Sequence, residues 1–289
     1  MSYGMPYVGS KNKIARSIIS LLPPGKRFVD LFGGGGAMTH CAVLSGKYEC
    51  VLYNEVLPLV ADTFRKAIDG YYTRDNFYPR WVSRDEFHAI KGKDGYAALC
   101  FSFGCDMETY FCSAEKEQKK KQGHEDYVLG KYLKRGGGVL KPGNELQEIE
   151  SIERLARLAR LARYCHVDVR CGDYSDYEHR DGDIVYCDPP YRTSKTEKKF
   201  YRNEDEKRKA AFAFDCEAFD EWCATRPFQV FVSGYEVPDE RFVPVMSQRK
   251  ISLYCASDNR TMKDEIVYTQ ARYAPEQAIV TCDQLSMEV

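Results

Sequence analysis

The stretch Asp183-Ile184-Val185-Tyr186-Cys187-Asp188-Pro189-Pro190-Tyr191 decides the fold expected for this chain. Its first five residues are mostly apolar and predict a buried central strand over 183–187. The two prolines end that strand because neither can donate a hydrogen bond to a sheet, so the chain must turn sharply. Open α/β sheets bind ligands beyond the carboxyl ends of their strands. We therefore expect a reaction site at this turn.

The Asp-Pro-Pro-Tyr turn suits methylation of an exocyclic amine on a nucleobase. Such an amine is a weak nucleophile because its lone pair is delocalised into the ring. We expect the Asp188 carboxylate and the Pro189 carbonyl to accept its two hydrogens, and the carboxylate to stabilise the positive charge that grows on nitrogen. Tyr191 offers a flat face to a base taken out of its duplex. The alternative is a turn that only ends a strand.

A glycine loop near the N-terminus favours the first interpretation. Residues 27–32 predict a strand that runs into Gly33-Gly34-Gly35-Gly36, and residues 37–44 predict a helix. Backbone N–H groups approach a ligand closely at such a junction, aided by the helix dipole. The spacing fits neither the dinucleotide-binding fingerprint nor the phosphate-binding P-loop. A loop whose glycines serve only a tight turn is the alternative.

Two further predicted strands end in carboxylates. Residues 49–53 lead into Asn54-Glu55, and residues 166–171 lead into Gly172-Asp173-Tyr174. An acidic side chain roughly twenty residues after the glycine loop is where nucleoside-binding α/β units bind ribose hydroxyls. Together with the first turn, these strand ends predict a site that binds a nucleoside at several points.

In this order, the segments resemble the Dam-type DNA adenine methyltransferases (D12 class, alpha group), and the chain looks like a phage or prophage member of that family. The resemblance runs from about residue 6 to about residue 270 and includes Pro6-Tyr7-Val8-Gly9-Ser10-Lys11, 214–219 and 230–235. It implies an α/β fold: a Rossmann-like, doubly wound methyltransferase sheet with an inserted target-recognition subdomain. It also implies transfer of a methyl group to N6 of a flipped adenine in duplex DNA.

The resemblance implies S-adenosyl-L-methionine as the methyl donor. Tyr7 and Lys11 would contact its methionine end, along which the glycine loop would lie, and Glu55 would bind its ribose. Asp173 would accept from its adenine amine, with Phe32 or Tyr174 packing nearby. The implied catalytic residues are Asp188, Pro189, Pro190 and Tyr191, and the implied cofactor-binding residues are Tyr7, Lys11, Asp30, Phe32, Gly33, Gly34, Gly35, Gly36, Glu55, Asp173, Tyr174 and Asp188.

Two of these residues have an ordinary alternative. Lys11 also fits a solvent-facing lysine beside Lys13. Asp30 would either assist the methionine ammonium or close the turn after its strand.

The expected domain organisation has three parts. Residues 1–70 and 144–275 form the catalytic domain, 71–143 the target-recognition insert and 276–289 a tail. We expect helices over 14–22 and 57–70, and a long amphipathic helix within 144–164. Its apolar positions are Leu146, Ile149, Ile152, Leu155, Leu158 and Leu161. Its other side carries arginines that we expect to face solvent, namely Arg154, Arg157, Arg160 and Arg163.

The insert is expected to contact DNA, but its residues do not predict the recognised sequence. Its aromatic side chains fit either a small core or contacts to bases: Phe101, Phe103, Tyr110 and Phe111. Basic runs fit either phosphate contacts or solvated surfaces. They are Lys116 with Lys119, Lys120 and Lys121, then Lys131 with Lys134 and Arg135, and Lys195 with Lys198, Lys199 and Arg202.

Composition agrees with an intracellular enzyme. The 289 residues include 42 basic and 43 acidic side chains, so any positive DNA-binding surface must be local. No run of apolar residues is long enough to span a membrane, so we expect the cytoplasm and no membrane partner. We expect twelve reduced cysteines, no metal site, because no Cys-x-x-Cys pair occurs, and no obligate protein partner.

Three rival functions stay open on sequence alone. A DNA cytosine-N4 or an RNA adenine methyltransferase would share the site chemistry. A protein-glutamine methyltransferase would carry Asn where this chain has Asp188. A relative that binds nucleic acid without turnover would keep the fold but is disfavoured by the complete set of acidic strand ends.

Overall fold

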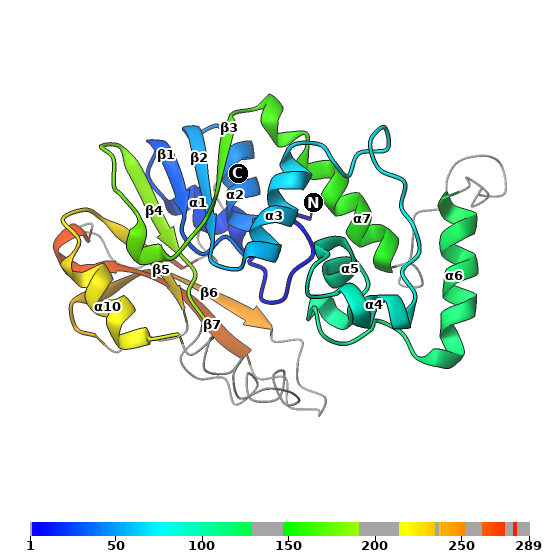
Figure 1. The fold of residues 1–289 in the computed structure, drawn as a ribbon. Helices are drawn as coiled ribbons and strands as arrows, with labels where there is room; N and C mark the ends of the chain where they lie inside the picture. The colour runs from blue at the N-terminus through cyan, green and yellow to red at the C-terminus, as the bar shows by residue number, and fades with distance from the viewer. Residues whose placement is uncertain are drawn as a thin grey trace.

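The chain forms one eight-stranded sheet with helices on both faces (Figure 1). The computed structural model describes residues 2–128, 147–190, 214–234, 237, 239–251, 262–274 and 280–281. The strands lie in the order β3-β2-β1-β4-β5-β7-β6-β8. Their bounds are β1 Gly25–Asp30, β2 Tyr48–Glu55, β3 His166–Cys171, β4 Asp183–Cys187, β5 Val230–Gly234, β6 Phe242–Ile251, β7 Met262–Gln270 and β8 Val280–Thr281.

The sheet has a parallel part and an antiparallel part. β3, β2, β1, β4 and β5 pair in parallel, as the α/β prediction requires. β7 runs antiparallel between β5 and β6. The strands predicted over 166–171 and 183–187 are confirmed, whereas β1 ends at Asp30, because Leu31 and Phe32 already belong to the turn. The antiparallel pair β6 and β7 was not predicted.

The central strands are buried on both faces, which explains their continuous apolar sequences. Phe28 of β1 and Tyr186 of β4 belong to the hydrophobic cluster that includes α1, α2 and α3. Their neighbours Val29 and Val185 belong to the opposite cluster, which includes Phe219 of α10. Successive side chains of a strand point to opposite faces, so each central strand contributes to both cores.

The helices agree with the predicted positions to within a few residues. α1, α2 and α3 confirm the helices expected over 14–22, 37–44 and 57–70. Beside them, on the side away from α10, lie α4, α5, α6 and α7 (Figure 1). The bounds are α1 Ala15–Leu21, α2 Ala37–Ser45, α3 Pro58–Ile68, α4 Arg84–Ile90, α5 Gly95–Cys100, α6 Ala114–Val128, α7 Gln147–Leu158 and α10 Cys216–Thr225.

Side-chain caps fix where several helices begin. Ser83 Oγ accepts from the N–H of Glu86 at the start of α4, and Asp94 accepts from Tyr96 at the start of α5. These caps satisfy N–H groups that have no partner inside the helix, and each stabilises its helix by roughly 1 kcal/mol.

Three of the four aromatic residues singled out between 71 and 143 form core. Phe101, Tyr110 and Phe111 are buried in the same hydrophobic cluster as Phe28. Phe103 is 62% exposed. The core alternative is therefore correct for Phe101, Tyr110 and Phe111. Of the four side chains, only Phe103 is exposed enough to contact a partner.

Helix α7 carries four of the predicted apolar positions, Ile149, Ile152, Leu155 and Leu158. Leu161 lies in the 3-10 helix that follows, and Leu146 lies outside the described residues. One arginine of α7 was assigned wrongly. Arg154 does not face solvent: its Nη2 donates to the carbonyls of Tyr3 and Met5, at 3.0 and 2.9 Å. The carbonyls of the N-terminal segment need donors, and a guanidinium supplies several in one plane. Arg160 and Arg163 are exposed, as expected.

Two further expectations concern the chain as a whole. The ten cysteines among the described residues are free thiols. Within those same residues, no helix combines the length and the apolar character needed to cross a membrane.

Candidate active site

Strand register brings three carboxyl groups to one edge of the sheet. Asp30, the last residue of β1, pairs with Tyr53 of β2 and with Tyr186 of β4. Glu55 lies two residues beyond Tyr53, and Asp188 lies two residues beyond Tyr186. The carboxyl ends of parallel strands share an edge, so all three side chains reach the region where such sheets bind ligands.

Two glycines of the loop after β1 are required by close packing. A Cβ at Gly33 would lie 2.2 Å from the Tyr53 ring, and one at Gly36 would lie 2.1 Å from the Phe64 ring. Gly36 also has φ +67°, a conformation that a side chain disfavours. The fold alone therefore requires glycine at both positions.

The other two loop glycines lie against the N-terminal segment. A Cβ at Gly34 would come within 2.9 Å of the Tyr7 ring, and one at Gly35 within 2.7 Å of Tyr7 Cβ. Tyr53 Oη donates to the Gly34 carbonyl at 2.7 Å and so ties the loop to β2. The structure thus brings together Tyr7 and the loop, two of the predicted cofactor contacts.

Glu55 is buried and accepts two backbone N–H groups. Its Oε2 accepts from Gly34 at 2.8 Å, and its Oε1 accepts from Leu57 at 2.9 Å. Burial raises the pKa of this carboxyl above its ordinary value, while the backbone hydrogen bonds act in the opposite direction. Glu55 therefore links the glycine loop to the start of α3.

Asp30 is also buried and binds neutral donors. Its Oδ2 accepts from the Thr39 hydroxyl at 2.8 Å and from the Thr39 N–H at 3.2 Å. Burial raises its pKa to about 7, and the charges of Asp188 and Glu55 add to that effect. Asp30 thus fixes the first turn of α2, in line with the turn-closing alternative.

An aromatic cluster lies beside β3 and β1. Phe32 and Tyr174 stack on each other with ring centroids 5.5 Å apart, and Phe219 contacts both edge-on. Asp173 is exposed and caps the short helix η4 (Tyr174–Asp176), accepting from the Ser175 N–H at 2.8 Å. The predicted pair of rings is therefore brought together, and Asp173 lies next to it in the chain.

Lys11 contacts the carboxylate at the centre of the predicted site. Its Nζ lies 2.5 Å from Asp188 Oδ1 and 3.4 Å from Glu265 Oε1. Lys11 is 3% exposed, so the alternative of a solvent-facing lysine is wrong, whereas Lys13 is exposed. Burial alone would lower the Lys11 pKa, but the two carboxylates outweigh it and raise that pKa. Lys11 therefore stays protonated at neutral pH.

The rest of the Asp-Pro-Pro-Tyr turn is only partly described. Pro189 is half-buried and Pro190 is exposed. Tyr191 lies outside the described residues, so its stacking on a base stays a prediction. The basic runs at 131–135 and 195–202 lie outside them as well.

The sequence analysis did not identify Glu265 as a site residue, and it did not predict the hydrogen bonds of Asn54. Glu265 is 1% exposed and lies near the start of β7, beside Ile266, which pairs with Gly234 at the end of β5. The start of an antiparallel strand shares an edge with the ends of parallel strands. Asn54 Nδ2 donates to the carbonyls beyond β1 and β3, at 3.0 and 2.9 Å, and so holds the two turns together. The available signal for Glu265 was an acid directly before the apolar run Ile266-Val267-Tyr268.

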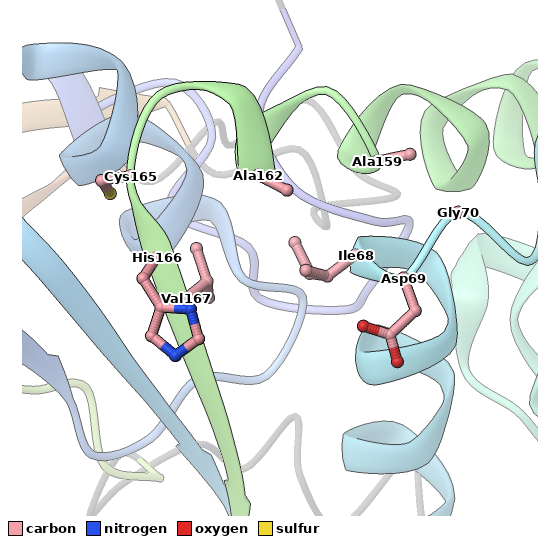
Figure 2. Close-up of a pocket in the computed structure, with 8 residues that line it drawn as sticks. All are labelled: Ile68, Asp69, Gly70, Ala159, Ala162, Cys165, His166 and Val167. Atoms are coloured by element: carbon pink, nitrogen blue, oxygen red, sulfur yellow. The ribbon is translucent and has the colours of Figure 1, made fainter.

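A cavity of about 370 Å³ lies elsewhere, between the end of α3 and the start of β3 (Figure 2). Its lining includes Ile68, Ala162 and His166. His166 begins β3, so the cavity lies at the amino edge of the sheet, opposite the edge with the carboxyl groups. It is therefore separate from the candidate active site.

One protein family matches most of this chain. The sequence pattern of one family, D12 class N6 adenine-specific DNA methyltransferase, matches residues 7–233. No curated protein matches the chain. Among solved structures, one of a candidate methylase from Haemophilus influenzae aligns with a TM-score of 0.33 and 11% identity, covering 92% of this chain and 91% of that one.

Proposed function

We propose a specific reaction for this chain, which belongs to the D12 class N6 adenine-specific DNA methyltransferase family and is therefore an enzyme with DNA as its substrate class. In that reaction, a methyl group passes from S-adenosyl-L-methionine to N6 of an adenine flipped out of duplex DNA. The observation that carries the proposal is Asp188, bound by Lys11 at the carboxyl end of β4.

The residues at the carboxyl edge fit this methyl donor. Asp30 and Glu55 are buried carboxyls whose pKa is raised by burial, and no described residue forms a salt bridge with either. S-adenosyl-L-methionine carries an ammonium, a sulfonium and a ribose with two hydroxyls, which complement such groups. We assign the ammonium to Asp30 and the ribose to Glu55, with Tyr7, Lys11 and the glycine loop along the methionine portion.

The adenine of the cofactor is assigned to the aromatic cluster. The Phe32 and Tyr174 rings are partly buried and offer apolar faces of the right size. We assign the adenine amine to Asp173, whose carboxyl is exposed next to Tyr174. When bound, the cofactor supplies an electrophilic methyl group on a sulfonium.

Asp188 and the Pro189 carbonyl act on the target amine. Each accepts one N–H hydrogen, which draws the lone pair of the nitrogen out of conjugation with the ring. The nitrogen becomes cationic as it gains the methyl group, and the carboxylate stabilises that charge more than it stabilises the neutral amine. The nitrogen then loses one proton, for which we assign Asp188 as the acceptor.

Catalysis and target recognition are assigned to different parts of the chain. We propose that residues 1–70 and 144–275 form the catalytic domain and that 71–143 recognise the target, with 276–289 as a tail. Exposed lysines of α6, such as Lys116 and Lys119, support phosphate contacts by this part of the chain. Unstacking the adenine costs a few kcal/mol, which DNA binding must offset.

The test is transfer of a tritiated methyl group from S-adenosyl-L-methionine to unmethylated duplex DNA, followed by digestion to nucleosides. We expect the label in N6-methyldeoxyadenosine. A duplex whose adenines already carry N6-methyl groups is the control and should take up no label. Label in N4-methyldeoxycytidine, or in RNA alone, would contradict the proposal.

A further inference from the structure

Three buried charged groups meet beside the proposed reaction centre. Lys11 Nζ lies between Asp188 Oδ1, at 2.5 Å, and Glu265 Oε1, at 3.4 Å. The side chains of Lys11 and Glu265 are 2% and 1% exposed, against 19% for Asp188. Of the two carboxylates, Asp188 is therefore the one that faces the substrate side, and Glu265 lies behind the lysine.

Glu265 is held in place by the sheet itself. Ser233 Oγ donates to Glu265 Oε1 at 2.8 Å, and Ser233 pairs with Val267 in the β5–β7 ladder. A buried carboxylate is costly unless charge and hydrogen bonds compensate it. Because Glu265 lies on β7, within the β5–β7 ladder, its carboxylate is held in place. It contacts the Lys11 ammonium, which also contacts Asp188.

The charge balance of this triad bears on the reaction. Lys11 and Asp188 alone would sum to zero, and a neutral pair stabilises a developing cation poorly. Glu265 Oε1 contacts the same ammonium at 3.4 Å, so Asp188 shares the Lys11 charge with a second carboxylate and is less fully neutralised by it. The dielectric is low at such a buried position, so this difference acts strongly on a nearby reacting atom.

We propose that Glu265 is a positioning residue for methyl transfer: it balances the charge of Lys11, so that Asp188 keeps its full effect on the amine that becomes cationic. This inference rests on the proposed function and adds to it a residue from β7. Glu265 acts on Asp188 through Lys11, whose ammonium contacts both side chains.

The first test is Glu265→Gln, which keeps the size and an acceptor oxygen but removes the charge. We expect the single-turnover rate of methyl transfer, at saturating cofactor and DNA, to fall about tenfold. Asp264→Asn is the matched control, because Asp264 precedes Glu265 on β7 and is exposed. It should keep the rate within about twofold. An unchanged rate in Glu265→Gln would overturn the proposal.

The second test separates charge balance from a merely structural role. If Glu265 acts through Lys11, Glu265→Gln should change the rate by less than about twofold in a Lys11→Met background, against about tenfold in the wild type. A merely structural defect would lower the rate in both backgrounds. An equal fall in both backgrounds would therefore also overturn the proposal.

A readout without DNA or cofactor keeps this inference distinct from the proposed function, which is tested on the wild type alone. Glu265→Gln should lower the melting temperature of the wild type, because it breaks a buried ion pair. In the Lys11→Met background it should not, because two carboxylates would otherwise repel each other. An equal loss in both backgrounds would contradict the coupling between Lys11 and Glu265, whatever the activity of the wild type.

Discussion

The carboxyl edge of the sheet holds two pairs of acids in different ways. Asp30 and Glu55, which we name the neutral-donor pair, bind backbone N–H groups and a hydroxyl. Asp188 and Glu265, which we name the lysine pair, share the ammonium of Lys11. Asp30 and Glu55 end the neighbouring strands β1 and β2, whereas β5 separates β4, which precedes Asp188, from β7, which carries Glu265. All four side chains lie at the same edge of the sheet and differ in their partners.

The difference shows what each kind of partner achieves. Backbone N–H groups are dipoles, and at the neutral-donor pair they do not offset the cost of burial, so both pKa values are raised. A full positive charge does offset it, as the raised pKa of Lys11 itself indicates. The lysine pair is therefore the side suited to stabilising a charge that appears during reaction, and the neutral-donor pair is suited to receiving a cationic ligand.

The largest expected effect is at the lysine pair. Asp188→Asn keeps the shape of the side chain but removes its charge, so methyl transfer should slow by roughly a thousandfold, as for removal of one preorganised stabilising group. The dissociation constant of the cofactor should change by less than about threefold. Radiolabel transfer and equilibrium binding measure the two quantities.

Asp181→Asn is the control for this variant, since Asp181 is exposed and precedes the same strand. If Asp188→Asn turned over within about tenfold of the wild-type rate, the proposal that the lysine pair stabilises the charge formed during methyl transfer would be wrong.

At the neutral-donor pair we expect a smaller effect, on cofactor affinity and not on the transfer rate. Glu55→Gln offers one acceptor oxygen where two N–H groups now bind, so the loop and the ribose contact should both weaken. We expect the cofactor dissociation constant to rise about tenfold, with the transfer rate at saturation within about threefold. Titration calorimetry and single-turnover kinetics measure these.

Glu49→Gln on the same strand is the matched control, because Glu49 is exposed. A loss of rate at saturation without a loss of affinity would assign Glu55 to the chemistry and contradict the comparison.

The smallest expected effect concerns the ionisation of Asp30. Its pKa is about 7 in the folded protein and ordinarily 3.8, so between these values the folded state binds a proton that the unfolded state lacks. Stability then falls as pH rises, and from pH 6 to pH 8 the loss is about 1 kcal/mol. Asp30→Asn should lack this loss.

The measurement is urea unfolding of wild type and variant at both pH values, with the exposed Asp69→Asn as control. If the stability of the wild type and that of Asp30→Asn changed equally with pH, Asp30 would be ionised over the whole range. That result would contradict the prediction.

Local sequence was enough to predict four of the five parallel strands, β1, β2, β3 and β4, but not β5. The strand before Asp188, the glycine loop and the strand before Glu55 each combine an apolar run with a residue type that ends it. Such signals lie within about ten residues, so a single pass along the chain finds them. The carboxyl groups at the ends of these strands were predicted for the same reason.

The antiparallel half and the lysine contact could not be found in this way. Glu265 reaches the edge only because β7 reverses direction, and the burial of Lys11 depends on a partner 177 residues away. The sequence around Lys11 also contains Lys13, which is exposed, so composition does not separate the two. Contacts between distant segments are set by packing, and local patterns do not record them.

The contact between Arg154 and the segment before Lys11 has a consequence for the order of folding. Its two hydrogen bonds join residues 151 and 149 positions apart, whereas the Gly4 N–H donates to His40, 36 positions away, and the Met5 N–H donates to the Gly35 carbonyl. Closing the longer loop costs more entropy, so we expect this segment to dock on the glycine loop and α2 first and to gain its contact with α7 later.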